Sequence, residues 1–516
     1  MAADLFWPAI ALPVAAGAVL SLLVERLLQP AGTLPFWKRP WAALAIHMGL
    51  WLLLFTLDFA VFRRPWFAVA TVLAFLLLVI QVSNAKFHSL REPFIVQDFE
   101  YFTDAIKHPR LYLPFLGMGR ALIIAVGFGA ALYAGLTLET ALTARMPARD
   151  FFLGIIALAV FGLVLLFSGA RKKLTVILEP ATDLRQLGLM ASLWRYGEEE
   201  HKPHCVCSRY DFEEPAPDIA KALPNLVVVQ SESFFDARRL FPGIRMDVLR
   251  EFDGIKTSAA CQGQVEVSAW GANTVRTEFS FLSGLDPEAQ GVHRFNPYRK
   301  LARQGIPTLA GFLKHCGYRT VCIHPYLAGF YARDQVFPLL GFDEFIDIRD
   351  FNDAGKTGPY IGDIAVAEKV CALLAASTQP VFVFVITMEN HGPLHLEKVR
   401  EGDLERLYSS PPPAGCDDLT IYLRHLSNAD RMAGMLRDQL AALPGAGWLC
   451  WYGDHVPIMP AVYEAMSPPD GQTDYLIWGK GGNPGQGARL DLKIENLGFL
   501  LLRKMGLISA FANDVE

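Results

Sequence analysis

Five apolar stretches, each long enough to cross a bilayer as a helix, constrain this chain more than any other feature. They occupy residues 5–24, 41–62, 66–85, 121–138 and 151–170 of the 516 residues. About 20 apolar residues span the roughly 30 Å of hydrocarbon, because a helix satisfies its own backbone hydrogen bonds there. Five such runs in succession are not typical of a soluble core. We therefore predict that residues 1–170 form an all-α transmembrane domain of five helices.

The composition agrees with this prediction, since 52% of the residues are hydrophobic and the mean hydropathy is +0.27. The first stretch is not expected to be a cleavable signal peptide, because it lacks a charged start and four more spans follow it. His47 and Asp58 lie on one face of the second span. Each is close enough to a span end to reach the interface, and we favour this over a functional role.

Two sequence signals disagree about the orientation of the chain in the membrane. Five spans place the termini on opposite sides, and the count of basic residues in the loops favours a cytoplasmic C-terminal part. The eight cysteines all follow the last span, and an even number on one side fits an oxidising compartment instead. Cys205 and Cys207 could alternatively bind a metal.

The remaining chain divides into two parts. Residues 171–222 are polar without sustained periodicity and are predicted to be a connecting segment. From residue 223 to 516, short β-branched or aromatic runs alternate with helical patterns, which predicts a mainly parallel sheet with helices on both faces. Residues 91–115, between the third and fourth spans, mix aromatic and charged residues, so they fit either an amphipathic segment on the bilayer surface or an ordinary helical loop.

Polar side chains follow four of the predicted strands at the point where each strand ends. These side chains are Glu232, His324, the group Glu389, Asn390 and His391, and the pair Asp454 and His455. In an open α/β sheet, ligands bind in the crevice at the carboxyl ends of the strands. A single polar residue at a strand end is more often a cap or a satisfied polar group. Polar residues at the ends of four strands together predict a site.

Thr274, within the stretch "SAWGANTVRTEFSFLSG", has two interpretations. It is either a helix N-cap, with Thr277 or Glu278 closing a capping box, or a nucleophile at the positive end of a helix. A threonine hydroxyl needs a base or a metal to remove its proton. Glu232, Asp454 and His455 could hold a divalent ion against it, and three oxygens with one nitrogen suit Mn²⁺, Mg²⁺ or Zn²⁺.

The order of several motifs resembles the lipoteichoic acid synthase family of membrane phosphoglycerol transferases, within the alkaline phosphatase and sulfatase superfamily. The motifs are "SES", "GANTVRTEFSFLSG", "IHPYLAGFYARDQVFPLLGFDEFID", "VITMENHGP" and "YGDH". The resemblance implies a sulfatase-like α/β catalytic domain over residues 223–516. It also implies an extracytoplasmic position for that domain, and hence a multi-pass protein of the cell (inner) membrane.

The resemblance also implies roles for individual residues. Thr274 would be the nucleophile and would join Glu232, Asp454 and His455 as a ligand of one divalent metal, usually manganese or magnesium. His391 and Arg333 would bind the phosphate, and His324 and Tyr331 would line the same pocket.

The implied reaction is a double displacement. Thr274 attacks the phosphorus of phosphatidylglycerol, diacylglycerol leaves with a proton that His391 could supply, and a glycan or glycolipid hydroxyl then attacks the phosphothreonine ester. No nucleic-acid partner is expected. This chain departs from the family at Gln230, where a histidine is usual, at "YARD" (331–334) in place of "WNRD", and at Pro325 and Tyr326 in the glycerol-binding region. Phosphoryl transfer is therefore the firmer expectation, and glycerol phosphate as the transferred group the weaker one.

Three alternatives remain. A phosphoethanolamine transferase would share the site, and the eight cysteines favour it, although the sequence around Thr274 does not. A sulfatase is disfavoured, because no cysteine lies in the "C/S-x-P-x-R" context that formylglycine formation requires. A non-catalytic membrane sensor that retains the fold would be expected to have lost a ligand or the nucleophile, and every proposed position is occupied.

Overall fold

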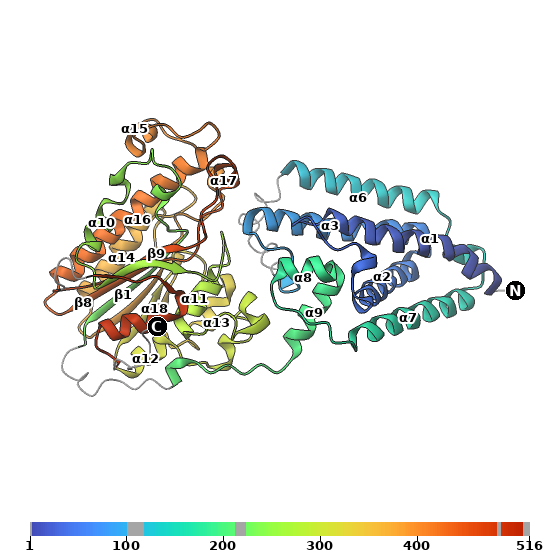
Figure 1. Ribbon diagram of the computed structural model, residues 1–516, viewed down its shortest axis with the longest axis horizontal. Coiled ribbons are helices and arrows are strands. Elements are labelled where there is room, and N and C mark those ends of the chain that lie inside the picture. Colours follow the sequence, from blue (N-terminus) through green and yellow to red (C-terminus); the bar gives the residue numbers. More distant parts are fainter. Residues whose placement is uncertain (1–2, 101–117, 212–222, 482–486, 509–516) are drawn as a thin grey trace. The chain divides into compact units, whose positions relative to one another are not determined.

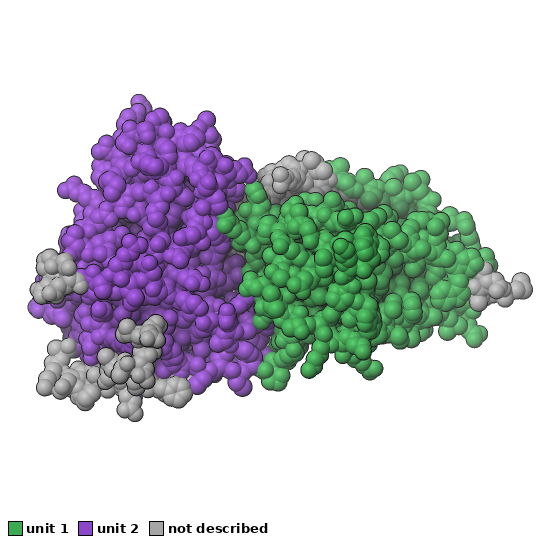
Figure 2. Space-filling model, viewed as in Figure 1, with its two compact units in different colours: residues 1–203 green, residues 204–516 purple. Residues whose placement is uncertain are grey.

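The computed structural model describes residues 3–100, 118–211, 223–481 and 487–508. The chain forms two compact units, residues 1–203 and residues 204–516 (Figures 1 and 2). We describe each unit by itself.

Unit 1 is helical and apolar, as predicted. Its long helices are α1 (Ala3–Val24), α2 (Trp41–Phe62), α3 (Pro65–Leu90), α6 (Met118–Leu138) and α7 (Ala148–Ala170). Within the described residues, four helices are long and apolar enough to cross a membrane: 5–27, 41–62, 65–90 and 148–170. The fifth predicted span coincides with α6, part of whose side chains lies outside the description. The chain is thus a membrane protein with a helical N-terminal region.

Small residues let α2 and α7 pack closely. A Cβ atom added to Gly49 would lie 2.6 Å from the Leu166 backbone nitrogen, and one added to Gly169 would lie 2.5 Å from the Ala42 carbonyl oxygen. Close backbone approach through small residues is typical of helix packing in membranes, where dispersion contacts replace the hydrophobic effect. The opposite side of α7 exposes large apolar side chains such as Phe161, as expected of a lipid-facing surface.

His47 is buried among polar partners, and its expected position near the interface stays a prediction. Its side chain is buried within unit 1, where Nε2 lies 3.0 Å from the Ser21 hydroxyl and Nδ1 lies 3.3 Å from Glu25 Oε1. Asp58 accepts a hydrogen bond from Thr71. Neighbouring helices supply polar partners for both side chains, which periodicity within one span does not reveal.

The predicted connecting segment contains two helices, α8 (Pro180–Leu187) and α9 (Leu189–His201). Both belong to unit 1, where Leu184 and Leu189 pack in the same apolar cluster as residues of the long helices. At 8 and 13 residues, these helices are too short to give a clear periodic signal. Residues 212–222, and residues 101–115 of the predicted amphipathic segment, lie outside the described residues.

Unit 2 is built on a mixed sheet in the order β10-β2-β9-β8-β1-β7-β3-β4, with β11 also paired to β2 (Figure 1). The strands are β1 (Asn225–Ser231), β2 (Cys261–Glu266), β3 (Arg319–Ile323), β4 (Glu344–Ile346), β7 (Val381–Ile386), β8 (Gly447–Gly453), β9 (Thr473–Gly479), β10 (Ala488–Arg489) and β11 (Leu492–Lys493). A separate hairpin pairs β5 (Lys356–Thr357) with β6 (Tyr360–Ile361). The five strands from β8 to β4 are parallel, as predicted, whereas β9 runs antiparallel to both β8 and β2.

Helices cover both faces of this sheet. The α-helices of unit 2 are α10 (Arg250–Lys256), α11 (Thr274–Ser283), α12 (Leu309–His315), α13 (Arg333–Val336), α14 (Asp363–Ala376), α15 (Asp403–Leu407), α16 (Asp417–Ala442), α17 (Pro460–Met466) and α18 (Ile494–Lys504). Along β1, Val227 and Val229 pack with α10, α14 and α16, while Leu226 and Val228 pack with α11, α12 and α18. This alternation explains the continuous apolar run, because both faces of a central strand are buried.

Candidate active site

The carboxyl ends of β1 and β8 bring three predicted metal ligands together. Ser231 pairs with Gly453 in the parallel register, so Glu232 emerges beside Asp454 and His455. One ligand atom from each of the three lies within 4.8 Å of the others. His455 Nε2 is 3.5 Å from Glu232 Oε1 and 3.3 Å from Asp454 Oδ2. All three side chains are buried.

These residues fit a divalent cation. Asp454 Oδ2 and His455 Nε2 are buried without a hydrogen-bond partner, which is costly unless a ligand satisfies them. Burial, and then the negative charge of Asp454, raise the pKa of Glu232 to about 8. A cation would satisfy both orphan atoms and cancel this repulsion. Carboxylate oxygens and an imidazole nitrogen suit Mn²⁺, Mg²⁺ or Zn²⁺ and do not select among them.

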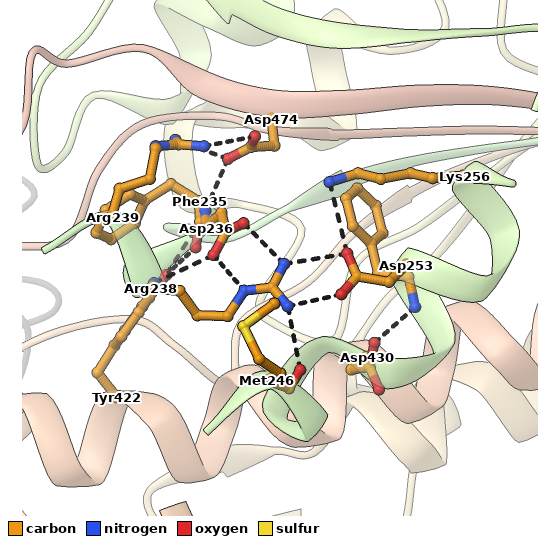
Figure 3. A network of polar contacts seen from close by, with 11 residues as sticks. Phe235, Asp236, Arg238, Arg239, Met246, Asp253, Lys256, Tyr422, Asp430 and Asp474 are labelled. Carbon is orange, nitrogen blue, oxygen red and sulfur yellow. Dashed lines mark hydrogen bonds and ion pairs between the residues drawn. The ribbon is translucent and has the colours of Figure 1, made fainter. Parts of the chain in front are cut away.

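A polar network fixes the segment that follows Glu232 (Figure 3). Arg238 donates to Asp236 and Asp253, and Arg239 donates both terminal nitrogens to Asp474 at 2.8 Å. The backbone N–H of Asp236 also donates to Asp474 Oδ2 at 2.7 Å. These bonds join the segment after β1 to β9 and α10, so Glu232, the candidate metal ligand before this segment, adjoins a chain segment that is fixed to the rest of the domain.

Thr274 is the first residue of α11, and its interpretation as an N-cap is wrong. Asn273, in the left-handed region at φ 65°, occupies the cap position without a side-chain hydrogen bond to the helix. Thr277 donates to the Asp454 carbonyl at 2.9 Å, and Glu278 pairs with Arg333, so neither closes a capping box. The Thr274 hydroxyl makes no hydrogen bond to any residue in the described part of the chain.

Glu232 and the four predicted substrate-binding residues meet Thr274 in one pocket. Glu389 and Asn390, also predicted at the end of β7, do not line it, and the Glu389 carboxylate instead accepts from the Asp363 backbone N–H and from Asn428. The lining of the pocket consists of Glu232, Ala272, Asn273, Thr274, His324, Phe330, Tyr331, Arg333, Ile386, Met388 and His391. Thus the structure places the nucleophile candidate, one metal ligand and all four predicted substrate-binding residues around the same space. α11 begins at this pocket, and a helix N-terminus favours bound anions.

Only one ring nitrogen of His391, Nε2, is left without a hydrogen bond among the described residues. Its Nδ1 lies 2.8 Å from the Gly392 carbonyl oxygen, which makes Nδ1 a donor, and 3.3 Å from the Tyr360 hydroxyl. Burial lowers the pKa of His391, so the ring is neutral near pH 7 and Nε2 accepts a proton.

The sequence did not predict three polar residues that contact the candidate site: Ser233 bonds to Glu232, Glu278 bonds to Arg333, and Gln230 bonds to Glu278. Gln230 stands where the resembled family often has histidine, and here it accepts from the Tyr452 hydroxyl at 2.7 Å and donates to Glu278 at 3.3 Å. The sequence shows Glu278 four residues after Thr274, but a capping box accounts for this spacing equally well, so the pairing of Glu278 with Arg333 is not predictable from it. Tyr331 and Ala332 are consecutive left-handed residues, at φ 56° and φ 53°, and no sequence signal marks them.

The structure shows no disulfide among the eight cysteines in its described residues, and Cys205 and Cys207 are exposed. No metal cluster among the described residues involves these two cysteines.

Comparisons with known proteins agree with this architecture. The sulfatase family model matches residues 224–497. The capsular polysaccharide biosynthesis protein RkpI of Rhizobium meliloti is 28% identical over 426 residues, which cover 78% of this chain and 75% of RkpI.

Two solved structures are similar. Integral membrane phosphoethanolamine transferase A from Neisseria meningitidis aligns with a TM-score of 0.58 at 13% identity, over 96% of this chain and 95% of its own, and so shares the fold. Streptococcus pyogenes phosphoglycerol transferase GacH aligns with a TM-score of 0.46 at 21% identity, over 60% of this chain and 79% of its own. Because the family match runs from the start of β1 into α18 and covers more than half of the residues, the chain belongs to the sulfatase family.

Proposed function

We propose that this protein is a membrane-bound, metal-dependent phosphoglycerol transferase. It moves a phosphoglycerol group from phosphatidylglycerol to a glycan or glycolipid of the cell envelope, through a covalent phosphothreonine at Thr274. One observation carries the proposal: the unbonded Thr274 hydroxyl, at the N-terminus of α11, lines the same pocket as Glu232, Arg333 and His391. The name of the relative RkpI, a capsular polysaccharide biosynthesis protein, supports a glycan acceptor.

The domain arrangement follows from this activity. Residues 1–170 would form the transmembrane domain and residues 223–516 the extracytoplasmic catalytic domain. Residues 171–222 would connect them, although their helices α8 and α9 pack within unit 1. A lipid donor accounts for the attachment of the catalytic domain to membrane helices, since its phosphate is reached at the bilayer surface.

Glu232, Asp454, His455 and the Thr274 hydroxyl would hold the metal. When bound, a divalent ion of this kind lowers the pKa of a coordinated hydroxyl and offsets negative charge on phosphoryl oxygens. Arg333, whose guanidinium lines the pocket, donates N–H groups to a phosphoryl oxygen.

The two half-reactions balance in bonds and protons. In the first half-reaction, Thr274 Oγ forms a bond to phosphorus while the bond from phosphorus to the diacylglycerol oxygen breaks. Thr274 loses one proton and the departing diacylglycerol oxygen gains one. The acceptor hydroxyl then forms the new bond to phosphorus, its proton returns to Thr274, and the phosphothreonine ester is cleaved. His391 carries the proton in each half through Nε2, which its neutral state leaves open.

Mass spectrometry of the full-length protein tests this proposal. The protein in detergent, loaded with Mn²⁺, is incubated with vesicles of phosphatidylglycerol and phosphatidylethanolamine without acceptor, beside Thr274→Ala and Thr274→Ser variants. We expect a glycerophosphate adduct on residue 274 of the wild type and of the serine variant, and none on the alanine variant. A phosphoethanolamine adduct would identify the alternative transferase. No adduct on a metal-loaded protein would contradict transfer and favour the non-catalytic sensor.

A further inference from the structure

Glu278 is a charged residue of α11 that belongs to neither the candidate metal cluster nor the nucleophile. It lies four residues after Thr274 on α11, so both side chains share one face of the helix. It is fully buried. Its carboxylate accepts hydrogen bonds from Arg333, from the Tyr298 hydroxyl and from Gln230 Nε2.

The pairing of Glu278 with Arg333 is bidentate. Arg333 Nε and Nη2 donate to the two carboxylate oxygens at 3.1 and 2.9 Å, and both side chains are buried. Nη1 lies 3.2 Å from His324 Nε2. A guanidinium has five N–H groups, so two remain, and they meet no acceptor among the described residues. Arg333 therefore offers donors to the pocket while Glu278 cancels its charge.

The same contacts fix His324 as a neutral ring. Because Nε2 accepts from Arg333, the proton lies on Nδ1, which donates to the Ile386 carbonyl oxygen at 3.2 Å. Burial, and then the positive charge of Arg333, hold the pKa of His324 well below its usual value. Neither Arg333 nor His324 thus adds net positive charge to the pocket that both line.

We propose that Glu278 is a positioning and specificity-determining residue, which aims Arg333 into the pocket and, by cancelling its charge, favours singly charged phosphodiesters over doubly charged phosphomonoesters. This inference rests on the proposed function of the same site. Coulomb energy scales with the ligand's charge, so an unopposed guanidinium attracts a dianion about twice as strongly as a monoanion. The lipid donor and the glycerol-bearing phosphothreonine are both phosphodiesters with one negative charge, whereas a phosphomonoester, whose second pKa is about 6, carries close to two at pH 8.

Binding of two small anions tests the proposal directly. Dimethyl phosphate is singly charged and methyl phosphate is almost doubly charged at pH 8, and the two are similar in size. Their affinities for the Mn²⁺-loaded full-length protein are measured by calorimetry. Relative to the wild type, we expect Glu278→Gln to shift the affinity ratio toward methyl phosphate, on the order of tenfold. Arg333→Gln is expected to shift the ratio in the opposite direction.

Controls separate charge from general disruption. Tyr298→Phe removes a neutral donor to Glu278 and should leave the affinity ratio unchanged. Glu278→Asp keeps the negative charge and should show the wild-type ratio. The double variant Glu278→Gln with Arg333→Gln removes both charges, and its ratio should lie closer to the wild-type value than that of either single variant. Thermal unfolding and Mn²⁺ content are measured for every variant. If Glu278→Gln does not fold, Arg333→Gln and the double variant decide the outcome.

Equal changes in both affinities, with an unaltered ratio in the folded variants, would overturn the proposal. The experiment measures binding of the two anions and does not require the protein to catalyse transfer. A protein that forms no adduct on Thr274 can still show the ratio shift, so failure of the inference and failure of the proposed transferase are distinguishable.

Discussion

Ser233 donates its backbone N–H to Asp454 Oδ1 at 2.8 Å, across 221 residues of sequence. Its hydroxyl donates to Glu232 Oε1 at 3.0 Å and lies 3.3 Å from His455 Nδ1. Ser233 adopts a left-handed backbone conformation, at φ 55°, which turns the chain sharply after Glu232. One residue therefore contacts all three side chains of the metal cluster without offering a ligand of its own.

Replacing Ser233 by alanine should weaken metal binding. Loss of a hydrogen bond that orients a ligand typically costs about 10- to 100-fold in metal affinity, and we expect a loss in this range when the full-length protein is titrated with Mn²⁺. Ser427→Ala is the matched control, because within the described part of the chain the Ser427 hydroxyl bonds only to the Leu423 carbonyl of α16. An unchanged Mn²⁺ affinity in Ser233→Ala would show that the hydroxyl does not orient the ligands.

Removal of the metal should destabilise the protein more as the pH rises. The pKa of Glu232 is raised to about 8 in the metal-free protein, above the ordinary value of 4.5, so the folded state binds this proton more tightly than the unfolded chain does. That contribution to stability is fully present below about pH 4.5 and is lost as the pH rises through about 8.

Metal binding requires the deprotonated carboxylate, so the increase in Tm caused by Mn²⁺ should grow between pH 5.5 and 8.5. Thermal unfolding with Mn²⁺ or with a chelator, at several pH values, measures this. An Asp454→Asn variant, which lacks both the repelling charge and one predicted ligand, should show a smaller increase in Tm and a weaker pH dependence. A chelator without effect on Tm at pH 8 would count against a metal site.

His391 should control the acid limb of the pH–rate profile. Burial lowers the pKa of His391, and only the neutral ring accepts a proton, so turnover should rise with pH around a midpoint below the ordinary value of about 6.5. We expect His391→Gln to lower kcat by about 100- to 10,000-fold and to remove this limb. His395→Gln, an exposed neighbour in the same loop, should leave the profile intact; loss of the limb in that control would point to a general effect on the loop.

The left-handed residue Ala332 should tolerate glycine unusually well. A non-glycine residue in this region costs roughly 1 kcal/mol, and glycine recovers that cost while losing about 0.4–1 kcal/mol through the entropy of the unfolded chain. We therefore expect Ala332→Gly to leave the free energy of unfolding nearly unchanged.

The same substitution at Ala372, an exposed position inside α14, should destabilise the protein by about 1 kcal/mol. Chemical denaturation of both variants gives the comparison. Equal destabilisation by the two substitutions would mean that Ala332 is not strained.

Much of the fold was predictable because its signals are local. Apolar runs of about 20 residues marked the membrane helices, and the buried strands β1, β3, β7 and β8 were recognisable as short β-branched runs that end in polar residues. The antiparallel strands β2 and β9 were not predicted. Cys261–Glu266 alternates polar with apolar residues only weakly, and its pairing with Thr473–Gly479 joins segments more than 200 residues apart.

The sequence by itself determined the apolar N-terminal helices, the central strands and the residue types offered at their ends, since each depends on neighbours along the chain. Only the tertiary structure decided how those residues are used. It placed Thr274 at the start of α11 with a hydroxyl that has no hydrogen bond among the described residues, joined Glu278 to Arg333 across 55 residues, and placed Ser233 beside the predicted metal ligands. The physical reason is that helix and strand periodicity records which face is buried, whereas the partner of a buried charge is chosen by packing between distant segments.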